Sequence, residues 1–314
     1  MIKTIGILGA GTMGHSIAVS FAMHGFPVAL YEPSEGRRQT VMRDIEAALD
    51  LLAGEDYMAA GDVGPALGRV TLHSDLAAAV ADCDYVIESA PEVMELKQKI
   101  FRDLDAVCRP DTVLASNTSS LPLKDMMAAV SPERRERMIV NHWFNPAHLI
   151  PLVELSCFGN MPEPIFREVE TLYRTIRKQT IRIRKDIPGL VANRIMQGVA
   201  REVFSLVENE VADPEDIDRA LKFGPAFRYA TTGQLEVTDF GGLDIWCVVG
   251  DNLLKEMDNS TCANPLLRAK VKQGKLGVKS GEGFYAYDRS AAEDIKKTFM
   301  RRLIHQLKAS EYYV

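Results

Sequence analysis

One short segment near the start of the chain constrains its fold more than any other. Residues 9–14 form a G-x-G-x-x-G pattern directly after the apolar run 2–8 and at the start of the helical pattern 12–25. The first glycine permits a tight turn, the second lets the backbone approach a pyrophosphate, and the third allows close helix–strand packing. This context predicts a dinucleotide bound at the helix N-terminus. The residues assigned to it are Gly9, Gly11, Thr12, Met13 and Gly14.

An acidic residue further along the chain argues against a purely structural glycine turn. Glu32 lies 23 positions after Gly9, at the end of the second apolar run 27–31, where its carboxylate can bind the hydroxyls of a ribose. A carboxylate there repels a 2′-phosphate and so favours NAD over NADP. Arg37 and Arg38 follow closely and offer an alternative, because they could receive that phosphate. FAD also uses such a fold, but the acid–base residues described below favour a dehydrogenase.

The rest of the first half alternates short aliphatic runs with longer helical patterns, which is typical of βαβ units around a parallel sheet. The fold class is therefore α/β, with a Rossmann-like, doubly wound, mostly parallel sheet. The expected strands are 2–8, 27–31, 69–72, 84–88, 112–115, 138–141, 152–156 and 180–184, and the expected helices are 12–25, 35–53, 92–107, 121–129 and 164–178.

After residue 187 the strand signals almost vanish. The patterns 190–211, 214–222, 238–258, 264–273 and 290–311 are all helical. The Pro188-Gly189 pair marks the change. We therefore expect an NAD-binding domain over residues 1–187 and an all-helical domain over 188–314, with the second contributing to the substrate cleft and to dimerisation.

Composition limits the partners. The chain has 314 residues, 46% of them hydrophobic and 25% charged, with a net charge of −6, so it carries no basic surplus for nucleic acid or anionic membranes. Five cysteines without a C-x-x-C pair predict neither disulfides nor a metal site and favour the cytoplasm. No apolar run is long enough to span a membrane.

Two segments carry candidate chemistry. Residues 116–121 follow the fifth expected strand, at the sheet edge where open α/β folds bind ligands, and we assign Asn117 to the cofactor site there. His142 follows the sixth expected strand, and Glu154 lies in the next extended run. A chain that doubles back can bring them together, and a carboxylate that orients a neutral imidazole makes it a general base. The alternative is an interior histidine beside a half-exposed strand residue.

Five motifs in this order resemble the L-3-hydroxyacyl-CoA dehydrogenase family over nearly the whole chain. They are the glycine loop, 116–121, 142–146 with Glu154, 185–194 and 279–285. The resemblance implies that His142 removes the hydroxyl proton as a hydride leaves for NAD, with Glu154 as its partner. It also implies that Ser119 and Asn193 bind the substrate oxygen and that Glu92, Lys97, Ser119 and Asn145 surround the nicotinamide ribose and ring. A homodimer is expected. An N-cap role for Ser119 and a helix-surface role for Asn193 are the alternatives.

Three features distinguish the chain from acyl-CoA members, in which lysines of region 44–68 are expected to bind the CoA phosphates. That region has no lysine here and several acids, and Pro151 stands where lysine is common. Arg228 could hold a free carboxylate, or it could be a surface or subunit-contact residue. We expect a small free 3-hydroxy acid as substrate; a 3-hydroxyacyl-CoA, an aromatic or pyridine-carboxylate alcohol, and a non-catalytic NAD-binding module are the alternatives.

Overall fold

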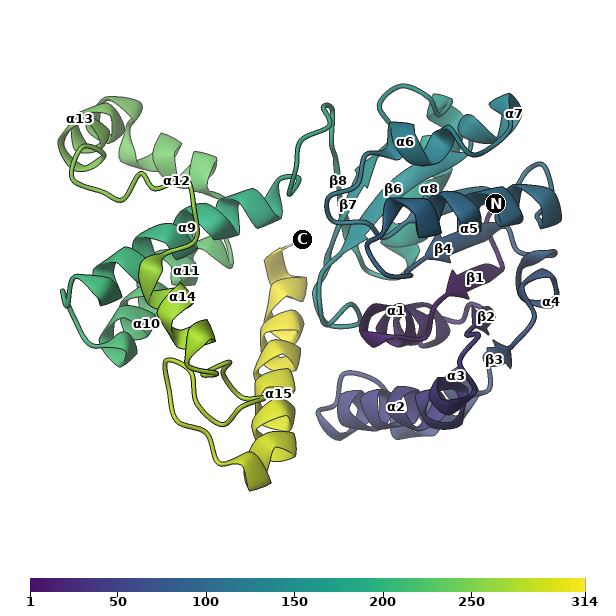
Figure 1. Ribbon diagram of the computed structural model, residues 1–314, viewed down its shortest axis with the longest axis horizontal. Helices are drawn as coiled ribbons and strands as arrows, with labels where there is room; N and C mark the ends of the chain where they lie inside the picture. Colours follow the sequence, from purple (N-terminus) through teal and green to yellow (C-terminus); the bar gives the residue numbers. More distant parts are fainter. Residues whose placement is uncertain (314) are drawn as a thin grey trace. The chain divides into compact units, whose positions relative to one another are not determined.

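A computed structural model describes residues 1–313 of the chain, which form two compact units. The first unit comprises Met1–Val191 together with Leu303–Leu307. The second comprises Ala192–Arg302 and the residues from Lys308 onward. Figure 1 labels the elements of both.

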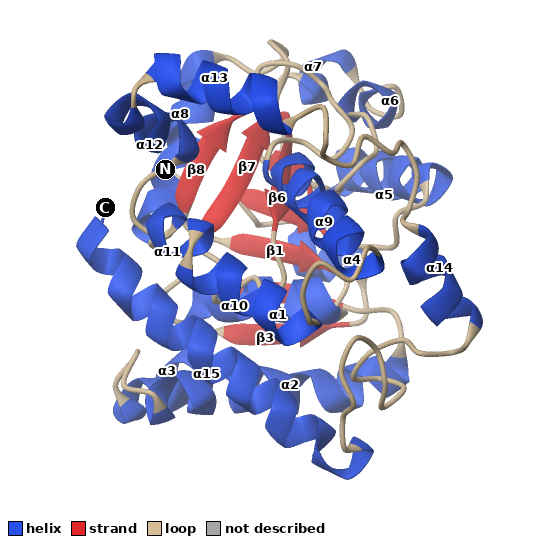
Figure 2. Ribbon diagram, turned by 90° about the vertical axis from the view of Figure 1, so that its left-hand side faces the viewer, coloured by secondary structure: helices blue, strands red, loops and turns tan. Residues whose placement is uncertain are grey.

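The first unit is built on a single sheet of eight strands in the order β3-β2-β1-β4-β5-β6-β7-β8. The strands are β1 (Ile5–Leu8), β2 (Val28–Tyr31), β3 (Val70–His73), β4 (Tyr85–Glu88), β5 (Val113–Ser116), β6 (Met138–Trp143), β7 (Leu152–Ser156) and β8 (Gln179–Arg182). Neighbouring strands from β3 to β6 are parallel, β7 runs antiparallel to β6, and β8 is parallel to β7. Figure 2 shows β6, β7 and β8 side by side. The doubly wound, mostly parallel sheet is confirmed.

Helices connect these strands. They are α1 (Thr12–Ala22), α2 (Glu35–Gly54), α3 (Val63–Leu67), α4 (Leu76–Val80), α5 (Met94–Val107), α6 (Leu123–Met127), α7 (Pro132–Arg135) and α8 (Glu163–Thr175), with the short 3-10 turn η1 (Ala60–Asp62) before α3. Ser34, Asp75 and Ser131 cap α2, α4 and α7 by accepting hydrogen bonds from backbone amides of the first turn. The sequence placed the end of α1 at 25, but the helix ends at Ala22 because Gly25 turns the chain with a φ of 92°.

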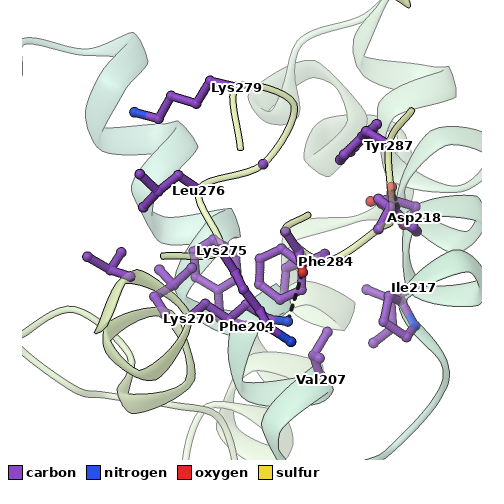
Figure 3. Close-up of a pocket in the computed structure, with 17 residues that line it drawn as sticks. Phe204, Val207, Ile217, Asp218, Lys270, Lys275, Leu276, Lys279, Phe284 and Tyr287 are labelled. Atoms are coloured by element: carbon purple, nitrogen blue, oxygen red, sulfur yellow. Dashed lines mark hydrogen bonds between the residues drawn. The ribbon is translucent and has the colours of Figure 1, made fainter. Parts of the chain in front are cut away.

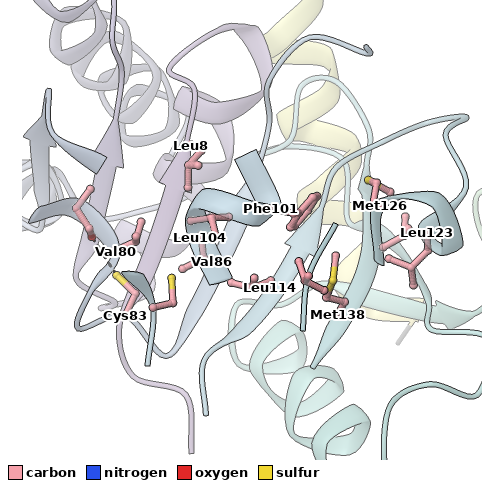
Figure 4. Packing of buried hydrophobic residues seen from close by; sticks show 14 residues of the cluster. Leu8, Val80, Cys83, Val86, Phe101, Leu104, Leu114, Leu123, Met126 and Met138 are labelled. Carbon is pink, nitrogen blue, oxygen red and sulfur yellow. Dashed lines mark hydrogen bonds between the residues drawn. The ribbon is translucent and has the colours of Figure 1, made fainter. Parts of the chain in front are cut away.

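The side chains of the strands alternate between two packed faces. One face carries a cluster from β1, β4, β5 and β6 that packs with α4, α5 and α6; it includes Leu8, Val80, Val86, Phe101, Leu104, Leu114, Leu123, Met126 and Met138 (Figure 4). On the other face, the rings of Phe21, Tyr85, Trp143 and Tyr173 pack edge to face or tilted, joining α1 and α8 to the strands. Burial on both faces explains the near-continuous apolar strands.

The second unit is helical where the structure describes it. Its helices are α9 (Ala192–Glu208), α10 (Pro214–Phe223), α11 (Pro225–Tyr229), α12 (Gln234–Gly241), α13 (Leu243–Leu253), α14 (Pro265–Lys272) and α15 (Ala292–Ser310), with the 3-10 turns η2 (Arg289–Ala291) and η3 (Glu311–Tyr313). The single helix expected over 238–258 is wrong. Gly242 separates α12 from α13 with a φ of 89°, which a helix does not accommodate.

One stretch of α15 belongs to the first unit. Ile304 is fully buried, and Nε2 of His305 lies 2.9 Å from Oε2 of Glu55, just after the end of α2. Among residues 1–313, no helix is both long and apolar enough to cross a bilayer.

Candidate active site

The glycine loop between β1 and α1 has the shape that a pyrophosphate requires. Gly9 has a φ of 91°, and a Cβ on Gly14 would stand 1.7 Å from the carbonyl oxygen of Gly9, so both positions need glycine. A Cβ on Gly11 would meet no atom within 4 Å, which leaves open space above the loop. The N-cap position, Gly11, supplies no side-chain acceptor, so the first amides of α1, at Thr12 and Met13, are available to an anion. The loop therefore fits a dinucleotide.

Glu32 is fixed beside this loop. Its Oε2 accepts a hydrogen bond from the Ala10 amide at 2.8 Å, and its Oε1 accepts one from the Ser34 amide at 2.9 Å. Each carboxylate oxygen retains a lone pair for a ribose hydroxyl. The two arginines that offered an NADP alternative are directed to the protein: Arg37 donates to the Ala10 carbonyl and pairs with Asp44, and Arg38 donates to the carbonyls of Glu32 and Pro33. This arrangement favours NAD.

A buried ion pair supports the same edge of the sheet. Lys97, on α5, is 1% exposed, and its Nζ lies 2.7 and 2.8 Å from the two carboxylate oxygens of Glu88, which is fully buried at the end of β4. Glu88 also accepts hydrogen bonds from the Ser116 hydroxyl at 2.6 Å and the Ala90 amide at 2.7 Å. The sequence predicts Lys97 in the cofactor site but gives no role to Glu88. The one sequence signal for Glu88 is that it is a charged residue at the end of the apolar strand 84–88.

Glu92 links this pair to the segment after β5. Its Oε1 accepts hydrogen bonds from the Thr118 hydroxyl at 2.6 Å and from the amides of Ser119 and Ser120 at 3.0 Å. Burial raises the pKa of Glu92, but these donors and the Lys97 ammonium outweigh it and hold that pKa below its ordinary value. The carboxylate thus fixes the backbone of the loop that presents the Ser119 side chain.

The other two assigned amides lie at the same edge. Asn117 accepts a hydrogen bond on its Oδ1 from the Trp143 amide at 3.0 Å, which ties the loop after β5 to the end of β6. Asn145 is exposed two residues beyond β6. The structure therefore brings Glu92, Asn117, Ser119 and Asn145 to the carboxyl ends of adjacent strands.

His142 and Glu154 face each other directly across the antiparallel pair β6 and β7. Nδ1 of His142 lies 2.8 Å from Oε2 of Glu154, and Nε2 lies 3.1 Å from the Ser119 hydroxyl. Glu154 is fully buried and His142 is 3% exposed, with its ring 4.6 Å from that of Phe144. With the Nδ1 proton donated to the carboxylate, Nε2 is left as an acceptor facing Ser119. This geometry suits a general base.

Two further assigned residues belong to the helical unit. Asn193 is half-buried in the first turn of α9. Arg228 lies on α11 and is exposed, and within residues 1–313 its guanidinium has no hydrogen-bond or ion-pair partner. It is therefore accessible to an anion from solution.

The helical unit also contains an apolar pocket of about 520 Å³, shown in Figure 3. Phe204 and Phe284 stack in its wall with ring centres 5.7 Å apart. Two of its polar groups are engaged by neighbours: Lys270 donates to the Gly283 carbonyl at 2.9 Å, and the Tyr285 hydroxyl donates to Asp218 at 2.8 Å. None of the residues that line this pocket is a histidine, so its lining holds no counterpart of the His142–Glu154 pair.

A glycine loop that fits a dinucleotide and a buried histidine–carboxylate pair on one sheet edge together define a nucleotide-dependent oxidoreductase. The profile described as "3-hydroxyacyl-CoA dehydrogenase, NAD binding domain" matches residues 4–187, and "3-hydroxyacyl-CoA dehydrogenase, C-terminal domain" matches residues 189–287. The chain belongs to the 3-hydroxyacyl-CoA dehydrogenase family and is an NAD-dependent dehydrogenase that acts on a hydroxyl group.

Relatives of two kinds are similar to it. A 5-formyl-3-hydroxy-2-methylpyridine 4-carboxylate 5-dehydrogenase from Mesorhizobium japonicum is 33% identical over 97% of both chains. A crystal structure of an enzyme of that name, described as an NAD+-dependent dismutase, has a TM-score of 0.89 at 31% identity over 99% of both chains. A 3-hydroxybutyryl-CoA dehydrogenase from Bradyrhizobium diazoefficiens is 35% identical over 91% of this chain and 96% of its own. The structure of the (S)-3-hydroxybutyryl-CoA dehydrogenase from Ralstonia eutropha has a TM-score of 0.73 at 32% identity, covering 92% of this chain and all of its own.

Proposed function

We propose that this dehydrogenase acts on a small alcohol that carries a free carboxylate, rather than on a CoA thioester. The main support is the charge of region 44–68. Asp44, Glu46, Asp50, Asp56 and Asp62 are exposed there, and the region contains no lysine or arginine. Such a surface repels a polyphosphate tail.

The likeness to solved structures supports the same conclusion. The pyridine-carboxylate dehydrogenase structure has a TM-score of 0.89 to this chain, whereas the (S)-3-hydroxybutyryl-CoA dehydrogenase structure has a TM-score of 0.73. A carboxylate-bearing ring, of the kind named for the former enzyme, is therefore the first substrate class to test.

In the proposed reaction, the glycine loop and Glu32 would hold NAD, which when bound would supply the hydride acceptor for the carbinol carbon. The Ser119 hydroxyl, now 3.1 Å from Nε2 of His142, donates a hydrogen bond to the substrate oxygen, and Nε2 takes the hydroxyl proton. Glu154 holds the Nδ1 proton and stabilises the imidazolium that forms. Asn193 adds a hydrogen bond to the same oxygen, Arg228 binds the carboxylate, and the Glu92–Lys97 pair and Asn145 support the nicotinamide end.

The experiment compares substrates on the purified protein. NADH oxidation with acetoacetyl-CoA is measured beside NAD reduction with free 3-hydroxy acids and with hydroxymethyl ring carboxylates. Turnover confined to free carboxylates supports the proposal, and efficient turnover of acetoacetyl-CoA with low KM contradicts it in favour of 3-hydroxyacyl-CoA. Arg228→Ala should raise KM for the carboxylate by about tenfold or more. Arg219→Ala, an exposed arginine on α10, is the matched control.

We also propose that the protein is a cytoplasmic homodimer formed through the helical domain, with the domain boundary at 187–188. Large apolar side chains on α12 and α13 are exposed, among them Leu235 and Phe240 at 82% and Leu243 at 62%. A second copy of the same surface would cover them. Light scattering tests this: Phe240→Glu with Leu243→Glu should yield a monomer, and Val211→Glu, outside these helices, should not. A monomeric unaltered protein would refute it.

A further inference from the structure

The segment that ends the first unit contains a tight turn. The Leu190 amide donates to the Ile187 carbonyl at 3.0 Å, with Pro188 and Gly189 at the two central positions. Gly189 has a φ of 80°. Proline followed by a residue with positive φ is the signature of a type II turn. The Pro188-Gly189 pair, which marked a domain boundary in the sequence, therefore has a defined conformation.

The next residue is held in an unusual backbone state. Leu190 has a φ of 51°, in the left-handed region, although it is neither glycine nor asparagine. Its side chain is 6% exposed, so packing holds the residue in place. Residues kept in this region cluster at functional sites, because the surrounding structure must impose the strain.

The backbone conformations of Gly189 and Leu190 direct the amide of Val191 toward Glu154. The Val191 N–H donates to Oε1 of Glu154 at 3.0 Å, while Oε2 of the same carboxylate lies 2.8 Å from Nδ1 of His142. Because the carboxylate is planar and rigid, a donor that holds one oxygen limits the rotation of the other. The amide therefore acts on the histidine through Glu154.

We propose that the turn Ile187–Leu190 is a positioning element for the His142–Glu154 pair, and that it acts by holding the Val191 amide on Glu154. The inference rests on the proposed role of His142 as the base. It places a requirement for catalysis on four residues that lie outside the hydrogen-bonded His142–Glu154 pair.

A double-mutant cycle in the full-length protein tests this with the best substrate of the panel above. Gly189→Ala, which disfavours the positive φ, should lower kcat by about tenfold while the Kd for NADH changes by less than about twofold. In a Glu154→Ala background the same substitution should lower kcat by less than about twofold, because the amide has lost its acceptor. Equal losses in the two backgrounds, or an unchanged kcat, would overturn the proposal.

Two further variants separate the amide from general strain. Val191→Pro removes the N–H, and Val191→Ala measures the loss of the side chain alone. Gly25→Ala places alanine at another positive φ, 92°, where a Cβ meets nothing within 4 Å, and should leave kcat unchanged. If Val191→Pro does not fold, the Gly189→Ala cycle still decides.

A spectroscopic readout is independent of turnover. In histidine-selective ¹⁵N-labelled protein, the Nδ1 proton of His142, assigned by its loss in His142→Asn, should move upfield in Gly189→Ala and not in Gly25→Ala, since a weaker hydrogen bond shields the proton. An unmoved signal would overturn the positioning role. A protein that turns over no free carboxylate but shows the shift would contradict only the proposed substrate.

Discussion

His142 and Glu154 are register partners on adjacent antiparallel strands, and their side chains meet at 2.8 Å between Nδ1 and Oε2. Side chains directly opposite each other on one face of a sheet are held by the whole strand pair. The pair is thus set by the backbone of β6 and β7 rather than by a loop. This explains how a buried histidine keeps one ring nitrogen directed at Ser119.

Removing the base should greatly slow the chemistry and spare cofactor binding. We expect His142→Asn to lower kcat by about 10²-fold or more, because general-base catalysis contributes on that scale. The Kd for NADH, from fluorescence titration, should change by less than about threefold. Glu154→Gln should lower kcat by a smaller factor. His73→Asn, whose ring nitrogen bonds only to Thr71 among the described residues, is the control. Undiminished turnover in His142→Asn would refute the mechanism.

Two glycines of the loop should respond differently to alanine. Gly11→Ala adds a methyl group to open space, so the fold should persist, but the methyl intrudes where a pyrophosphate approaches and should weaken NADH binding by about tenfold or more. Gly14→Ala sets a Cβ 1.7 Å from a carbonyl oxygen and should lower both the melting temperature and NADH binding. Circular dichroism melts and NADH titration of both variants check this. Unaltered binding in Gly11→Ala would contradict the assigned position of the cofactor.

The buried ion pair at the end of β4 should be costly to break. Lys97→Met leaves the fully buried Glu88 carboxylate unpaired and should destabilise the protein by about 3–5 kcal/mol. Adding Glu88→Gln should recover part of this loss. Lys99→Met, on the same helix but in a solvent-exposed pair with Asp103, should change stability by less than about 1 kcal/mol. Guanidinium unfolding measures all three, and similar costs for Lys97 and Lys99 would argue against the buried pair.

Lys178 should make stability depend on pH. Its Nζ donates to the carbonyls of Ala147 and Ile150, and burial lowers its pKa from 10.5 to about 7. Between pH 7 and 10.5 the unfolded chain therefore binds more protons than the folded one, so stability rises with pH in this window. From pH 7 to 9 this group should add about 2 kcal/mol. Burial also lowers the pKa values of His148 and His24, whose charged forms are further disfavoured by Lys178.

The test of Lys178 compares how the free energy of unfolding changes with pH, rather than its value at a single pH. Lys178→Met removes the titrating group and two hydrogen bonds together, so its absolute stability also changes. The gain in unfolding free energy between pH 7 and 9 should be smaller in this variant than in the unaltered protein. Equal gains would show that Lys178 stays protonated in the folded state.

The sequence by itself determined the elements whose signals are local. The glycine spacing, the apolar runs and the acid at Glu32 predicted the strand–loop–helix unit, and all eight expected strands are present. The sequence also indicated that His142 and Glu154 can meet, because they are only twelve positions apart and a single reversal of the chain suffices. The proposed roles of the site residues stay predictions until the variants are measured.

The tertiary structure decided the contacts that depend on orientation across elements. Glu88 forms its buried ion pair because α5 is oriented so that Lys97 lies against the end of β4, and the sequence does not reveal this orientation. From the sequence alone, Arg37 and Arg38 leave binding of NADP as an alternative to NAD. In the structure their guanidiniums donate hydrogen bonds to backbone carbonyls. The Val191 amide reaches Glu154 through two left-handed residues, and the split at Gly242 likewise depends on one backbone angle. The spacing of residues in the sequence reveals the periodicity of a single helix or strand. These contacts depend instead on how one element is oriented relative to another, and that orientation is set by the packing of the whole unit.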